Sequence, residues 1–149
     1  MSLLWSLVLF VHITAAAFWV GGQLMLSVVV LPLLRKTARP EVVAQVASLS
    51  GRRFAKLSNF GLFPLLIVTG PLLAWHDGVR IGAINASSFG RLLEVKILVV
   101  VAVLALAVFH GVAVRRLSRR SARRLAQITV VLSVLILALA AGLAILPTP

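Results

Sequence analysis

A histidine and two further side chains share one narrow face of the first apolar segment. His12, Trp19 and Gln23 follow each other at intervals of seven and four residues. At 100° per residue, they spread over about 40° of a helix. Lipid cannot satisfy polar groups, so we expect this stripe to face neighbouring helices. A neutral imidazole placed there could ligate haem iron or copper, or it could simply hydrogen-bond across a helix bundle.

Lys96 is a second candidate, because it lies about two turns inside an apolar segment that begins near Phe89. Arg91 and Glu94 are three residues apart, so they can pair on the helix surface. Lys96 points nearly opposite to Glu94, so its charge cannot be neutralised by that carboxylate. Either it snorkels outward to the membrane surface, or it faces a haem propionate, a substrate carboxylate or a metal-bound group.

Two further histidines lie near the ends of apolar segments. By depth, His12, His76 and Lys96 form an outer cluster, whereas His110 stands alone on the inner side. Two axial ligands of one haem approach the ring from opposite faces. His12 would therefore pair with His76 or with Lys96. The alternative is that the protein binds copper ions in transit, with His12, Met25, His76 and His110 as transient ligands.

The residue inventory excludes several kinds of chemistry. The chain has no cysteine, which rules out disulfides, iron–sulfur clusters and thiolate zinc sites. It shows no Ser/His/Asp set, paired carboxylates, phosphate-binding loop or His-x-x-His spacing, so no hydrolytic machinery is visible. Copper(I) prefers sulfur ligands, and Met25 is the only thioether within an apolar segment. Judged by its ligands alone, the chain favours b-type haem over copper.

The elements that must position these residues are predicted to be membrane helices. Of 149 residues, 61% are hydrophobic and 12% charged, with a mean hydropathy of +1.11. A soluble domain of this size could not bury so much apolar surface. Four apolar runs cover about 3–34, 57–75, 89–114 and 125–146. They predict a single transmembrane domain over residues 1–149, an all-α antiparallel bundle of four transmembrane helices.

Shorter features predict how these helices begin and bend. Pro40 opens an amphipathic stretch that predicts a short interfacial helix lying on the membrane surface. Its apolar residues are Val42, Val43, Val46 and Leu49. Pro64 and the pair Gly70-Pro71 predict a kink in the second transmembrane helix. Ser87 or Ser88 can cap the third.

The charge distribution predicts an orientation. Fifteen Lys and Arg oppose three acidic residues, which gives a net charge of +12. Twelve of the fifteen lie in the connections between the first and second runs and between the third and fourth. The positive-inside rule then predicts a multi-pass protein of the cytoplasmic membrane, with both termini and the 77–88 loop extracytoplasmic. The bilayer accounts for the basic residues, so no nucleic-acid partner is expected.

Four short motifs follow each other along the chain: Val11–Gly22 (VHITAAAFWVGG), Arg53-Phe54, Thr69-Gly70 and Phe89–Lys96 (FGRLLEVK). By their order and spacing, they resemble the membrane domain of the copper-resistance D (CopD) family over about residues 5–116. A second set of features consists of His12 with Trp19 and Gly21, Lys96, and Phe109-His110-Gly111. These features are similar to the HemJ-type protoporphyrinogen oxidases, membrane proteins associated with b-type haem. The first resemblance implies copper movement, and the second implies haem-linked oxidation.

The leading hypothesis from sequence is a bundle that binds b-type haem through His12, with His76 or Lys96 as the second ligand. Trp19 and Gln23 would line the pocket, and Arg91 or Lys96 would meet the haem propionates. The protein would then be a haem-dependent membrane oxidoreductase. It would transfer electrons or oxidise a membrane-soluble substrate, with a quinone or a redox protein as partner.

Two alternatives come from other functional classes. The first is copper uptake across the cytoplasmic membrane, with copper as cargo. The second is a structural membrane subunit, whose polar side chains only hold helices together.

Overall fold

The protein is described by a computed structural model covering residues 2–113 and 119–148, with side chains omitted at 81, 83, 85, 108–113 and 119–123. Every regular element in these ranges is helical, which confirms the predicted all-α class. The elements are α1 (Leu3–Leu24), η1 (Met25–Val30), α2 (Leu31–Thr37), α3 (Pro40–Leu57), η2 (Ser58–Leu62), α4 (Phe63–His76), η3 (Ile81–Ala86), α5 (Ser88–Ala113) and α6 (Arg119–Ala144).

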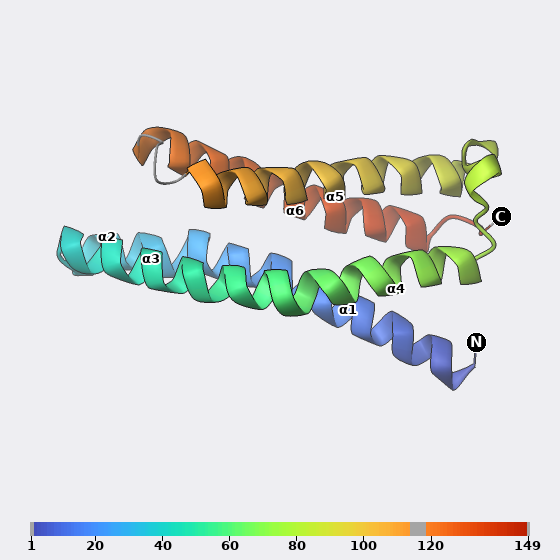
Figure 1. Ribbon diagram of the computed structural model, residues 1–149, viewed down its shortest axis with the longest axis horizontal. Helices are drawn as coiled ribbons and strands as arrows, with labels where there is room; N and C mark the ends of the chain where they lie inside the picture. Colours follow the sequence, from blue (N-terminus) through green and yellow to red (C-terminus); the bar gives the residue numbers. More distant parts are fainter. Residues whose placement is uncertain (1, 114–118, 149) are drawn as a thin grey trace. The chain divides into compact units, whose positions relative to one another are not determined.

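The chain divides into two compact units, residues 1–74 and 75–149. In the first unit, α1, η1 and α2 form one continuous helix of 35 residues, and α3, η2 and α4 form another that extends to His76, 37 residues in all. The two lie side by side and antiparallel (Figure 1). The turn between them is Ala38 and Arg39, both in extended conformation. Pro40 imposes that conformation on Arg39 and then occupies the first helical position of α3.

Each long helix contains a π-helical segment just before a proline. Pro32 follows η1 by two residues, and Pro64 follows η2 by two residues. A proline ring clashes with the carbonyl four residues earlier, which belongs to Val28 or Phe60 and lies inside the π segment. Widening the helix there relieves the clash. A π segment thus precedes Pro64, one of the two positions where a kink is predicted, whereas Pro71 lies within α-helical α4.

The interfacial helix predicted at Pro40 is not a separate element. Helix α3 continues through η2 into α4 without interruption. Between Glu41 and Phe60 the sequence contains no proline and only one glycine, Gly51, which a helix tolerates. The stretch is amphipathic as predicted, but its backbone has no break that would let it turn onto the membrane surface.

The second unit is a hairpin of α5 and α6, preceded by the short 3-10 helix η3 (Figure 1). Val103 of α5 and Ser133 of α6 are completely buried, and Phe89, Ile136 and Leu143 are nearly so. Gly142 allows close packing, because a Cβ there would lie 3.1 Å from Leu92 Cδ2. The unit therefore has its own small core.

Three helical stretches in the described ranges are long and apolar enough to cross a membrane: Leu3–Thr37, Pro40–His76 and Arg124–Ala144. A hydrocarbon core of about 30 Å needs roughly 20 helical residues. Large apolar side chains such as Phe10, Phe60 and Ile67 are exposed on these helices, as contact with lipid requires. Helix α5, with Arg91, Glu94 and Lys96 in its first turns, corresponds to the third of the four spans predicted from the sequence.

Candidate functional site

His12 binds Thr69 across the two helices of the first unit. His12 Nδ1 lies 2.7 Å from Thr69 Oγ1, and the Thr69 hydroxyl donates to the carbonyl of Leu65 at 2.6 Å. A hydroxyl has one proton, and here that proton points to Leu65. Thr69 can therefore only accept from His12, so Nδ1 carries the imidazole hydrogen.

This tautomer leaves the lone pair of the imidazole on Nε2. A histidine that ligates a metal through one nitrogen usually donates its other N–H to an oxygen, which fixes the ring orientation. Thr69 is buried, and His12 is half-buried. The imidazole lies beside the backbone at Gly70, where a Cβ would be 3.5 Å from His12 Cε1. The pair thus has the geometry of an oriented nitrogen ligand.

Trp19 lies two turns further along α1, in the same interface. Its ring meets Phe63 edge-on, with centroids 5.2 Å apart and planes at 77°, and only 5% of the residue is exposed. Gln23, one turn beyond, is half-buried. His12 and Trp19 of the predicted stripe thus contact the second long helix.

Thr69 was missed as a site residue, although the sequence carried a signal for it. Between Asn59 and His76 it is the only side chain with a hydroxyl, amide or charge, in an otherwise apolar segment. An isolated polar residue in a membrane span is expected to face another polar group.

The other predicted site residues belong to the second unit or lie at its start. His76 Nδ1 lies 3.3 Å from Asp77 Oδ1 at the exposed end of α4. Arg91 Nη2 donates to Ser88 Oγ at 3.2 Å, and no ion pair joins Arg91 to Glu94 among the described residues, although their spacing allows one.

Lys96 is half-buried on α5. His12 belongs to the first unit and Lys96 and His76 to the second, so the pairing of His12 with either stays a prediction. His110 lies in the helical backbone of α5, but its side chain is outside the described residues. Within the described part of the chain, no three His, Asp or Glu side chains gather as a metal site.

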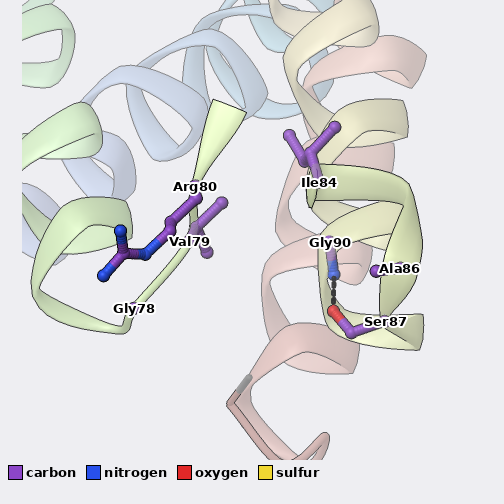
Figure 2. A pocket seen from close by; sticks show the side chains of 7 residues that line it. All are labelled: Gly78, Val79, Arg80, Ile84, Ala86, Ser87 and Gly90. Atoms are coloured by element: carbon purple, nitrogen blue, oxygen red, sulfur yellow. Dashed lines mark hydrogen bonds between the residues drawn. The ribbon is translucent and has the colours of Figure 1, made fainter. Parts of the chain in front are cut away.

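A hollow of about 330 Å³ lies in the loop before α5, and its lining includes none of the predicted site residues. Figure 2 shows its lining and the bond from Gly90 N–H to Ser87 Oγ at 3.0 Å, which confirms the predicted serine cap of α5. Its lining residues are Gly78, Val79, Arg80, Ile84, Ala86, Ser87 and Gly90. Apart from exposed Arg80 the lining is small or apolar, so it offers little catalytic chemistry.

Comparison with known proteins identifies a family for the chain. Residues 48–143 match the family model described as copper resistance protein D. A 65-residue stretch is 42% identical to an uncharacterized protein of Aquifex aeolicus (strain VF5), and it covers 44% of each chain. The chain therefore spans less than half the length of that relative. No solved structure matches it.

The matched residues include Thr69, His76 and Lys96 but begin after His12. They also reach further towards the C-terminus than the resemblance predicted from motifs, which ended at about residue 116. Because the match covers well over half of the chain, the protein belongs to the copper resistance protein D family and is a multi-pass membrane protein.

Proposed function

We propose that the protein carries copper ions into the cell across the cytoplasmic membrane. The observation that carries this proposal is the His12–Thr69 pair, which orients an imidazole inside a membrane hairpin. Imidazole is a good copper ligand, and the family to which the chain belongs is named for copper resistance. Copper is cargo here, so the site has to release the ion as well as bind it.

The charge distribution supports an orientation for this transport. Six basic residues lie between Arg35 and Lys56 and six more between Arg115 and Arg124, against only Glu41 in these segments. With both segments cytoplasmic, the two termini are extracytoplasmic and His12 lies in the outer half of the membrane. The two hairpins would then form the four-helix bundle, and His76 at the outer end of α4 would meet copper early.

Replacing His12 with alanine tests the proposal. We expect copper affinity of the purified protein to fall at least tenfold and cellular copper accumulation to fall with it, because the oriented nitrogen ligand is lost. Ile13→Ala is the matched control, since Ile13 is the next residue along α1 and its side chain is exposed. Copper affinity and accumulation that are the same in His12→Ala as in Ile13→Ala would contradict the proposal.

Thr69 gives a finer test of the same site. Thr69→Val keeps the shape of the side chain but removes the oxygen that accepts from His12 Nδ1. We expect copper affinity to fall about tenfold in this variant, as is typical when the partner of a metal-binding histidine is lost. Thr69→Ser retains a hydroxyl and should bind copper nearly as well as the native protein. Equal affinities in both variants would show that Thr69 does not orient the imidazole.

The haem hypothesis is separated from copper transport by an absorption spectrum of the detergent-purified protein. The same imidazole would suit haem iron, but the family description names copper. Under the copper proposal, no Soret band is expected. A Soret band that disappears in His12→Ala would instead establish haem binding. If His12→Ala changes neither the absorption spectrum nor copper affinity and accumulation, the structural-subunit alternative stands.

A further inference from the structure

Ser58 stands apart from the other buried polar residues of the described chain. Three are buried: Ser58, Thr69 and Ser133. The hydroxyls of Thr69 and Ser133 each donate to the carbonyl four residues earlier. Ser58 Oγ has no hydrogen-bond partner among the described residues, although the residue is only 4% exposed. A buried hydroxyl left in this way is costly, so it calls for an explanation such as a bound ion or water.

The position of Ser58 explains why its hydroxyl differs. It is the first residue of η2, and its backbone N–H is shared between the carbonyls of Phe54 and Ala55. Ser58 thus lies at the junction of α and π geometry, where the regular i−4 pattern to which a serine hydroxyl normally bonds back is interrupted. The hydroxyl is available to a group outside its own helix.

The helix register places Ser58 beside the polar stripe of α1. Trp19 meets Phe63, and the helices are antiparallel. Gln23 lies one α-helical turn after Trp19, and Ser58 lies one π-helical turn before Phe63. Both steps lead towards the basic end of the hairpin, and η2 packs against α1. Ser58 and Gln23 are therefore at one level, on the opposite side of the aromatic pair from His12.

We propose that Ser58 and Gln23 form an inner polar station, a water-accessible position for a hydrated cation on the cytoplasmic side of the Trp19–Phe63 pair. Hydroxyl and amide oxygens can hydrogen-bond to the water shell of the ion or coordinate the ion itself. The identification of the cation as copper rests on the proposed function. His12 would then bind the ion on the outer side, and the aromatic pair would separate the two stations.

Cysteine accessibility tests the station without reference to copper. The chain has no native cysteine, so Ser58→Cys introduces a single thiol. Leu62→Cys is the control, because Leu62 lies in the same π segment and is 8% exposed. Only the thiolate reacts with 2-aminoethyl methanethiosulfonate, and thiolates form where water reaches. In the full-length protein in liposomes, we expect Ser58→Cys to react at least tenfold faster. Equal rates would overturn the proposal.

Copper transport then tests the cargo. Ser58→Ala should lower cellular copper accumulation severalfold, and Ser58→Thr, which keeps a hydroxyl, should retain it. If Ser58→Ala accumulates as much copper as the native protein, copper is not the cation at the inner polar station, even if the cysteine reacts. If the native protein carries no copper, the proposed function fails, and the cysteine rates alone decide whether the station exists.

Discussion

Replacing Gly90 with alanine is expected to disrupt the start of α5. A Cβ at Gly90 would overlap the carbonyl oxygen and carbon of Ile84 and would also lie 3.2 Å from Ser87 Oγ. The Ile84 carbonyl is backbone and cannot rotate away as a side chain can. Helix α5 would therefore have to separate from η3, with strain on the Ser87 cap that Gly90 N–H completes. Overpacking and loss of the cap together should destabilise the protein by about 3 kcal/mol or more.

The measurement is thermal or denaturant unfolding of the purified protein in detergent, followed by tryptophan fluorescence and circular dichroism. Gly82→Ala is a matched control in the same loop, because a Cβ at Gly82 would meet nothing within 4 Å. We expect Gly82→Ala to unfold like the native protein and Gly90→Ala to unfold well below it. Equal stability in the two variants would show that η3 does not pack on Gly90 as described.

The helices of the fold were largely predictable, because apolar runs separated by basic clusters specify membrane spans. The predicted third run, 89–114, is close to α5 (Ser88–Ala113). The predicted fourth run began at 125, whereas α6 begins at Arg119, because arginine is a good helix former and no proline or glycine intervenes. The interfacial helix was wrong for a related reason. Polarity marks where a helix leaves lipid, but only a backbone break marks where it ends.

Half of the His12 site was predictable from spacing within one helix. The intervals from His12 to Trp19 and Gln23 define a common face, and His12 and Trp19 on that face do contact the second helix. The partner Thr69 could not be assigned, because periodicity within each helix does not set the register between helices. Ser58 was also missed, since its unusual hydroxyl depends on a π segment that sequence periodicity of 3.6 does not reveal.

The choice between haem and copper shows a different limit. An imidazole nitrogen serves both metals, and a shortage of sulfur ligands made haem the leading hypothesis. That preference assumed a tightly held cofactor. A transported ion needs weaker and exchangeable binding, for which one oriented imidazole and oxygen groups are suitable. The family match accordingly supports the copper alternative more strongly.

Replacing Trp19 with alanine should cause the second large loss of stability. Trp19 is 5% exposed and packs edge-on against Phe63. Removing the indole leaves a cavity in the α1–α4 interface. Because the alternative environment is lipid and not water, the loss comes mainly from packing, and we expect about 2–3 kcal/mol, below the 3–5 kcal/mol usual in soluble cores. Phe18→Ala, at an exposed neighbouring position, should cost much less.

A double-mutant cycle with Phe63→Ala isolates the contact between the two rings. If the T-shaped pair holds the hairpin together, the double variant should be more stable than additivity predicts, by about 0.5–1.5 kcal/mol. The measurement is the same detergent unfolding experiment on all four proteins. Additive losses would mean that each ring packs on other neighbours. In that case the contact between the two rings would not be what holds the hairpin together between His12 and the inner polar station.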